Sequence, residues 1–345
     1  MKNILLTLLL SFSIAGYAQQ ITQAADSQDR NNNFYDNEPL YKLKTNNIEI
    51  VGEIENPGKV DFTKLNKRSV IVKETKLNAD GTDSFIGAYR YDGYSLFDIL
   101  NERIINKKNA DKFRPIIDLY VEVENNQGDK VVISWGEIYY PNNLHNIIIA
   151  TDVMRIIPSK TKELWPLPVD AKLIVTSDLL TERNISNPVK ITVKSFDKDI
   201  PVNQNITPLY SDSFNFIDND KQNEFDRDRV VKELDTRTLH TIFYGRGKGI
   251  HSTSAFTGFL LKEAILPYTK LDSQNLRGSM IVINAKDGYR TVYTYSEIMN
   301  RNDQSEILLV PAFEEKEGGA WKIFPSCDFF SDRAVKAITD IYYIH

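Results

Sequence analysis

The chain has 345 residues, of which 41% are hydrophobic, and it carries a formal net charge of −5. This length and apolar content suffice for two hydrophobic cores, and the acidic balance argues against general affinity for nucleic acid. The single cysteine, Cys327, excludes an internal disulfide and a structural zinc site made of several cysteines.

The first 46 residues combine an export signal with a polar leader. Lys2 precedes an apolar run over residues 4–14, and small residues before Gln19 provide a cleavage site. We therefore predict a signal peptide over residues 1–18 and a flexible leader over residues 19–46, which are rich in Asn, Gln and Asp. A membrane anchor is the alternative, but the apolar run is short for a membrane span. The expected product is secreted or periplasmic, with no stable membrane insertion after cleavage.

Residues 47–194 carry strand and helix signals that predict a first folded domain. Residues 48–54 have the apolar, β-branched character of a strand. Ser95 is a candidate N-cap for a short helix, because Leu96 and Leu100 after it recur at helical spacing. A strand, a tight turn and a second strand follow this helix.

A long block of the first domain recurs later in the chain. Residues 120–150 align with residues 280–310 without a gap. The alignment matches Gly128 with Gly288, each in a tight turn between two strands, because glycine accepts the positive φ that such a turn needs. The block therefore predicts an internal duplication.

A second pair of matched blocks supports the duplication. KLIVTSDLLTER begins at Lys172, and KIFPSCDFFSDR begins at Lys322. We predict two copies of one domain, residues 47–194 and 239–345, joined by an acidic connector over residues 195–238. Strands and helices intermix in both copies, so the expected fold class is α+β with mixed or antiparallel sheets.

A glycine-rich segment at the start of the second copy is the best candidate for a ligand site. Its three glycines let a backbone approach a ligand closely, its two cations attract an anion, and free N–H groups in such a loop can form an anion nest. A flexible, solvated loop is the alternative interpretation. The candidate ligand-binding residues are Gly245, Arg246, Gly247, Lys248, Gly249, His251, Ser252 and Thr253.

Five further residues are secondary candidates. Glu74, Arg90 and Tyr91 lie where the first copy would have its cleft. Asp287 and Arg290 flank the repeated turn, where ordinary turn chemistry is the alternative. The four histidines have no metal-ligand spacing and no catalytic triad motif occurs, so no catalytic residue and no metal ligand is predicted.

Several short motifs resemble one known family. They are GEIENP from Gly52, YDGYSLFDIL from Tyr91, AKDGY from Ala285 and GGAWKIFP from Gly318. Taken together they are similar to the oxidoreductase molybdopterin-binding domain family, which has the sulfite-oxidase fold. The resemblance implies two degenerate tandem copies of that fold, with the glycine-rich segment bordering the pterin-cofactor cleft.

The chain departs from this family at the metal ligand. In the family's enzymes a cysteine thiolate binds molybdenum, whereas the corresponding places here hold Glu74 and Tyr244-Gly245. We therefore expect no cofactor and no redox catalysis, but a secreted or periplasmic binding or interaction protein for a small anionic or pterin-like ligand or a partner protein. The alternatives are a molybdopterin-dependent oxidoreductase with unconventional metal ligation and a structural component of an envelope assembly.

Overall fold

The computed structural model describes residues 38–345 with the exception of 159, 254 and 314–316. The predicted signal peptide, residues 1–18, and most of the predicted leader lie outside the described residues. Among the described residues, none of the helices has the length and apolarity needed to cross a bilayer.

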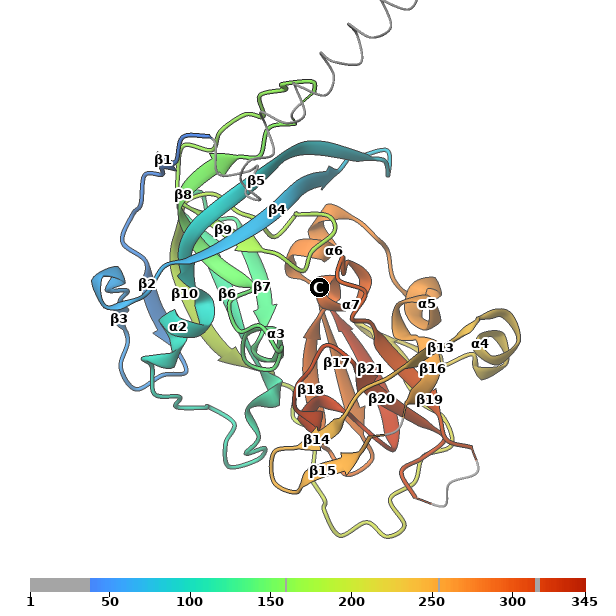
Figure 1. Ribbon diagram of the computed structural model, residues 1–345. Helices are drawn as coiled ribbons and strands as arrows, with labels where there is room; N and C mark the ends of the chain where they lie inside the picture. The colour runs from blue at the N-terminus through green and yellow to red at the C-terminus, as the bar shows by residue number, and fades with distance from the viewer. Residues whose placement is uncertain (1–37, 159, 254, 314–316) are drawn as a thin grey trace, which may run out of the picture.

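Two halves of similar construction lie side by side, with the first half in blue to green and the second in yellow to red (Figure 1). Each half has its own buried apolar core between two sheets. In the first half, alternate residues of the central strands point into that core, as the buried residues Val121 and Val123 do. Strand β6 thus has the period-two alternation of a strand with one face in a core.

The first half contains two five-stranded sheets. One has the order β3 (Gly58–Lys59), β2 (Glu49–Gly52), β10 (Pro188–Ser195), β6 (Leu119–Asn125) and β7 (Lys130–Ser134). The other has the order β1 (Tyr41–Lys42), β8 (Ile147–Arg155), β5 (Asp83–Ser95) and β4 (Arg68–Leu77), with β9 (Lys172–Val175) also paired to β8. Strand β1 belongs to the predicted leader, so the end of that segment is an ordered part of the first half.

The second half repeats this plan. One sheet has the order β12 (Lys221–Glu224), β11 (Asn215–Asp218), β21 (Ile338–Ile344), β17 (Met280–Ala285) and β18 (Arg290–Thr294). The other has the order β13 (Thr236–Leu239), β16 (Phe256–Leu260), β19 (Ile307–Pro311) and β20 (Trp321–Pro325). A separate hairpin, β14 (Phe243–Gly245) and β15 (Gly249–Ser252), lies beside it.

The strand directions of the two halves also agree. In each half one parallel pair, β2 with β10 or β11 with β21, lies within an otherwise antiparallel sheet. The matched hairpins β6–β7 and β17–β18 turn at Gly128 and Gly288, whose φ angles are 88° and 82°. The prediction of a tight turn at both glycines is confirmed.

The predicted α+β class is wrong, because the structure is predominantly β. The helices are short connections between strands, and the longest among the described residues, α4 (Arg227–Glu233), has seven residues. Ser95 does cap α2 (Leu96–Asn101) by accepting a hydrogen bond from the Asp98 amide, but this helix ends after six residues. The other helices are α3 (Trp135–Tyr139), α5 (Leu261–Ile265), α6 (Ser273–Gly278), α7 (Tyr295–Met299) and the 3₁₀ turns η1 (Phe62–Lys64), η2 (Ile116–Asp118), η3 (Leu266–Tyr268) and η4 (Ser331–Arg333).

The segment predicted as an acidic connector, residues 195–238, supplies strands and a helix to the second half. β11 pairs with β21, and the side chains of Phe214, Phe216 and Val230 are buried in the second core. Strand β12 is exposed along its whole length, so its polar sequence gave no alternating signal. The second folded unit thus includes residues before 239.

Candidate functional site

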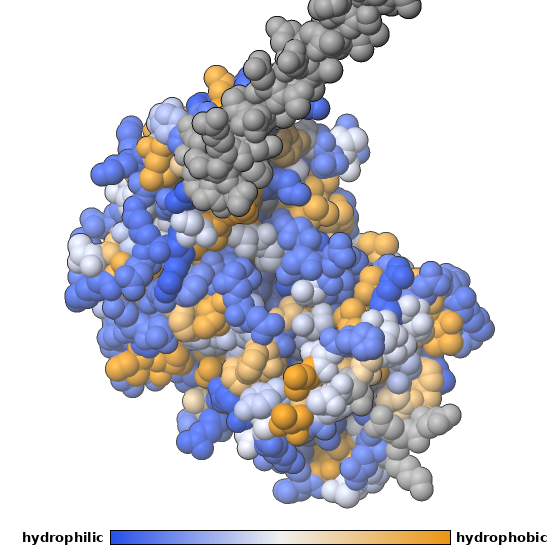
Figure 2. All heavy atoms as spheres, viewed as in Figure 1, coloured by the Kyte–Doolittle hydropathy of each residue, from blue (hydrophilic) through white to orange (hydrophobic). Residues whose placement is uncertain are grey.

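A pocket of about 530 Å³ opens beside the β14–β15 hairpin of the second half. Figure 2 shows apolar side chains on the surface in this region, and Ile242 and Ile250 of the hairpin segment are exposed. Most of the pocket wall is apolar or aromatic. These wall residues are Leu209, Phe243, Phe256, Ala285, Tyr289, Val310, Ile323, Phe324, Ala334 and Val335.

Three lysines add positive charge to this wall. Lys248 comes from the hairpin, Lys322 from β20, and Lys336 from the segment before β21. His251 of β15 also lines the pocket, and Asp287 contributes one opposing charge. The balance of charge at the pocket is therefore positive, although that of the whole chain is negative.

A glycine allows two of these lysines to approach each other. Gly318 has a φ of 91°, and a Cβ there would lie 2.9 Å from Cε of Lys322 and 3.6 Å from Cδ of Lys336. The main chains of the two lysine residues also form a β-bridge. The side chains of Lys322 and Lys336 thus both pass Gly318, which places their charges on one side of the pocket.

The glycine-rich segment forms a β-hairpin rather than the open loop expected. Tyr244 pairs with Ile250, and Gly245 pairs with Gly249, whose φ of 74° suits the turn. Gly245 is buried because the ring of His251 packs against it, and a Cβ there would overlap Nε2 of that ring. The glycines thus serve the hairpin and the packing of its histidine, and the structure does not assemble them into an anion nest.

The predicted ligand-binding residues therefore divide into two groups. Lys248 and His251 line the pocket. Arg246 is directed toward Asp332, with 4.0 Å between its Nε and Oδ1 of that carboxylate, and its side chain is 58% exposed. Arg246 and the remaining five lie outside the lining. These five are Gly245 under the His251 ring, Gly247 at the tip of the hairpin, Gly249 in its turn, Ser252 at the end of β15, and Thr253 on the surface.

The secondary candidates of the first half lie away from the pocket, around a buried ion pair of Glu74 that we call the filled corner of the first half. The buried carboxylate of Glu74 accepts hydrogen bonds from Lys172 Nζ at 2.6 and 2.8 Å and from Tyr91 Oη at 3.0 Å. Burial raises the pKa of Tyr91 well above its usual value, and the charge of Glu74 adds to the effect. Arg90 donates to Asp92 at the sheet surface at 3.0 and 3.2 Å. None of these three predicted residues lies at the pocket of the second half.

The two secondary candidates near the repeated turn have different positions. Asp287 lines the pocket, and its Oδ1 accepts a hydrogen bond from the Tyr289 amide, as in an ordinary turn. Arg290 is buried between the halves, with its Nε 3.3 Å from Asp118 and its guanidinium 4.3 Å from the ring of Phe113. Arg290 is thus part of the contact between the halves rather than of a ligand site.

A second polar cluster, which we call the central charge cluster, lies buried between α3 of the first half and α7 of the second. In the first half Arg183 Nη2 donates to Glu137 at 2.7 Å and to Asp178 at 2.6 Å. In the second half Arg333 Nη2 donates to Glu297 at 2.6 Å and to Asp328 at 2.6 Å. Both guanidinium groups are fully buried.

Bonds between the halves join the two parts of this cluster. Ser134 and Thr294 begin α3 and α7 in matching capping boxes. The hydroxyl of Ser134 also donates to Glu297 at 2.8 Å, and Arg183 Nη1 donates to the hydroxyl of Thr294 at 3.0 Å. Each cap therefore serves its own helix and the charged group of the other half.

The central charge cluster holds more negative than positive groups. Its four carboxyl groups face two guanidinium groups, an excess that favours retention of a proton. Burial raises the pKa of Glu297 to about 7, and the charge of Glu137 adds to this, although Arg333 opposes it. For Glu137 the charge of Arg183 and several hydrogen bonds outweigh burial, so the pKa of that group is lowered.

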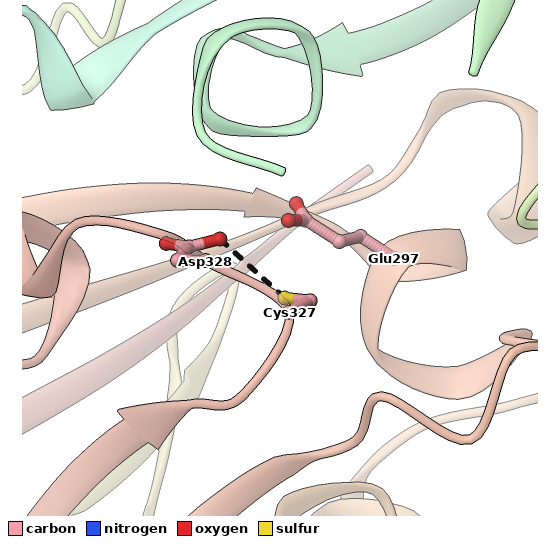
Figure 3. A group of neighbouring side chains, drawn as sticks. All are labelled: Glu297, Cys327 and Asp328. Carbon is pink, nitrogen blue, oxygen red and sulfur yellow. Dashed lines mark hydrogen bonds between the residues drawn. The ribbon is translucent and has the colours of Figure 1, made fainter. Parts of the chain in front are cut away.

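Glu297, Cys327 and Asp328 lie close enough together to be considered as metal ligands, since one ligand atom of each falls within 4.8 Å of the others (Figure 3). However, Arg333 donates to both carboxylates, and the thiol of Cys327 donates to Asp328 at 3.4 Å. Burial raises the pKa of that thiol well above its usual value, which disfavours the thiolate that metals bind. A cation here would have to displace a guanidinium that already binds both carboxyl groups, so the cluster is suited to holding the halves together.

The two places where the resemblance puts a molybdenum-binding cysteine do not fit such a centre. Glu74 is engaged by Lys172, and the ring of Tyr244 packs against Phe329 and Phe330 with centroids 5.6 and 6.2 Å away. Comparison of the chain with models of protein families found no match, and comparison with curated proteins found none either.

Proposed function

We propose that the protein is a binding protein without redox catalysis, and that it takes a small amphipathic anion into the pocket beside the β14–β15 hairpin. The observation that carries this proposal is the combination of three lysines with an apolar and aromatic wall around about 530 Å³. This volume lies within the range of roughly 300–1,000 Å³ of small-molecule sites, which pair apolar walls with a few polar groups.

The two kinds of lining residue would have separate tasks. Lys248 and Lys336 are exposed, so they attract an anion from solution and hold its charge at the rim. Phe243 and Phe256 are partly exposed in the wall and offer apolar surface that removes the ligand's body from water. The export signal predicted over residues 1–18 supports a place of action outside the cytoplasm, where the protein would meet an extracellular or periplasmic ligand.

A titration with 8-anilinonaphthalene-1-sulfonate, an aromatic anion, tests this function. We expect saturable binding of one molecule per chain. Replacing Lys248 and Lys336 together by Ala should weaken binding about five- to thirtyfold, because two exposed charge contacts are worth about 0.5–1 kcal/mol each.

The matched control removes the same charge elsewhere. Lys64 and Lys232 are exposed, and each makes a surface ion pair, with Asp61 and Asp228 respectively. Replacing these two lysines by Ala should leave the affinity for the probe within about twofold, an estimate that follows from screening of distant charges. Non-saturable binding, or equal losses in the two double variants, would contradict the proposed function.

A further inference from the structure

The β14–β15 hairpin has two different faces, and only one of them forms the pocket wall. Phe243 and His251 line the pocket, and the centroids of their rings lie 5.4 Å apart. Successive side chains of a strand point to opposite faces, so Tyr244 lies on the face opposite to that of Phe243. Ile250 pairs directly with Tyr244 and therefore lies on the same face as its partner.

This second face is apolar and exposed. The side chain of Ile250 is 66% exposed, and that of Ile242, which stands directly before β14 and two residues from Tyr244, is 58% exposed. The ring of Tyr244 packs against that of Phe329 with centroids 5.6 Å apart, and Phe329 is itself 50% exposed. We call Ile242, Tyr244, Ile250 and Phe329 the apolar face of the hairpin.

The tip of the same hairpin is basic. Arg246 and Lys248 flank Gly247 and are both exposed. Asp332 offers one carboxylate, 4.0 Å from Nε of Arg246. Exposed cations thus lie next to exposed apolar side chains, although the whole chain has a net charge of −5. Apolar and basic residues side by side are typical of segments that lie in the boundary between water and an anionic membrane.

The size of the apolar face favours a lipid surface over a protein partner. A stable interface between two proteins takes roughly 20–30 residues from each side. The apolar face of the hairpin has four residues, whereas a membrane boundary can be bound by a few apolar side chains together with basic ones. The hairpin also lies at the opposite end of the second half from α6, at the edge of the molecule (Figure 1).

We infer that the β14–β15 hairpin docks on the surface of a membrane that carries anionic lipids. Ile242, Ile250 and Phe329 enter the boundary between headgroups and acyl chains, while Arg246 and Lys248 contact the anionic headgroups. The membrane contact goes beyond the proposed function, because it uses the face of the hairpin opposite to the pocket wall. Docking in this way places the pocket beside the lipid, from which an amphipathic anion can enter it.

Co-sedimentation of the mature protein with vesicles tests the lipid contact. One kind of vesicle consists of phosphatidylcholine alone, and the other of phosphatidylcholine and anionic phosphatidylglycerol in a ratio of two to one. Binding to the anionic vesicles should be about tenfold tighter or more, because each cation near an anionic surface adds to the affinity. Arg246→Gln should weaken binding to the anionic vesicles about fivefold and leave binding to the neutral ones unchanged.

A double variant tests the apolar face, and a matched double variant serves as its control. Replacing Ile242 and Ile250 by Gln should weaken binding to the anionic vesicles about tenfold, because less apolar surface leaves water. Leu164 and Val169 of the first half are 67% and 61% exposed. Replacing these two by Gln should change the affinity by less than about twofold, since their side chains lie outside the docking surface.

Three outcomes would overturn the inference. They are an absence of binding to both kinds of vesicle, equal losses in the two double variants, and a dimer in sedimentation equilibrium that the hairpin variant dissociates, which would assign the apolar face to self-association. Without vesicles, the hairpin variant should bind 8-anilinonaphthalene-1-sulfonate as tightly as the unaltered protein, because neither isoleucine lines the pocket. Probe binding without vesicle binding would contradict only the membrane contact, and vesicle binding without probe binding would contradict only the proposed function.

Discussion

The first and second halves of the molecule are alike where they meet and different at their outer corners. At the centre, Arg183 and Arg333 make the same bonds to matched acids. At the outer corner, the first half holds Glu74 against Lys172, while the second half presents Lys322 to a pocket. Two halves of one plan can thus keep the same contacts where they meet while one of them opens a pocket.

The central charge cluster should show the largest effect on stability. Arg183→Met leaves Glu137 and Asp178 buried without their guanidinium partner, so it should lower the free energy of unfolding by about 3–5 kcal/mol. Arg333→Met should cost a similar amount, because Arg333 makes the matching bonds. Urea unfolding measures both losses.

A surface ion pair provides the control for these two variants. Lys190 is partly exposed and contacts Glu124 at 2.7 Å. Lys190→Met should change the free energy of unfolding by less than about 1 kcal/mol. A loss in only one of the two arginine variants would show that the halves are not equivalent at the centre.

The filled corner of the first half should show the next largest effect. Glu74→Ala leaves the ammonium group of Lys172, whose side chain is only 12% exposed, without its carboxylate. The expected loss in unfolding free energy is about 2–4 kcal/mol, below that of a fully buried pair because water reaches the lysine. Thermal or urea unfolding measures it. A loss no larger than that of Lys190→Met would mean that the corner is not held by this pair.

Substitutions of the matched turn glycines, Gly128 and Gly288, should have a smaller effect on the free energy of unfolding. Both have a positive φ, but a Cβ at Gly288 would overlap the backbone carbonyl of Pro201, whereas a Cβ at Gly128 would meet nothing within 4 Å. Gly128→Ala should therefore cost about 1–2 kcal/mol through backbone strain alone, and Gly288→Ala about 2–4 kcal/mol. Equal unfolding midpoints of the two variants would contradict the packing of residues 201–202 on this turn.

The pH dependence of stability should reveal the excess acid in the central charge cluster. The pKa of Glu297 is raised from 4.5 to about 7, so between these values the folded state holds a proton that the unfolded state has lost. The free energy of unfolding should therefore fall as pH rises from about 4.5 to 7, by about 1–3 kcal/mol, and change little above that. In the Glu297→Gln variant the free energy of unfolding should depend less on pH over this range, as thermal unfolding at several pH values measures. An unchanged pH dependence would mean that another group holds the proton.

Local sequence patterns predicted part of the fold. The ungapped repeat and the turns at Gly128 and Gly288 were recognisable because turn chemistry depends on adjacent residues. The fold class was not predicted correctly, because the residues that mark a helix after Ser95 form a helix of only six residues. The exposed strand β12 was also missed, since it lacks an apolar face.

The candidate site was predictable only in part. Lys248 and His251 lie in one glycine-rich segment, so sequence identified them together. Lys322 and Lys336 come from other parts of the chain and reach the pocket only through the pairing of β20 with the segment before β21. The acids and arginines of the central charge cluster occur at matched places in the repeat, but only the packing of the halves shows that they share one cluster.

A crystal structure of the mature protein soaked with 8-anilinonaphthalene-1-sulfonate tests the central difference between the two halves most directly. We expect the probe in the second half only, with its rings against Phe243 and Phe256 and its sulfonate on the side of Lys248 and Lys336. The first half should show Glu74 bound to Lys172 and no probe. The probe beside Glu74, or its absence from the pocket at saturating concentration, would contradict the proposed function.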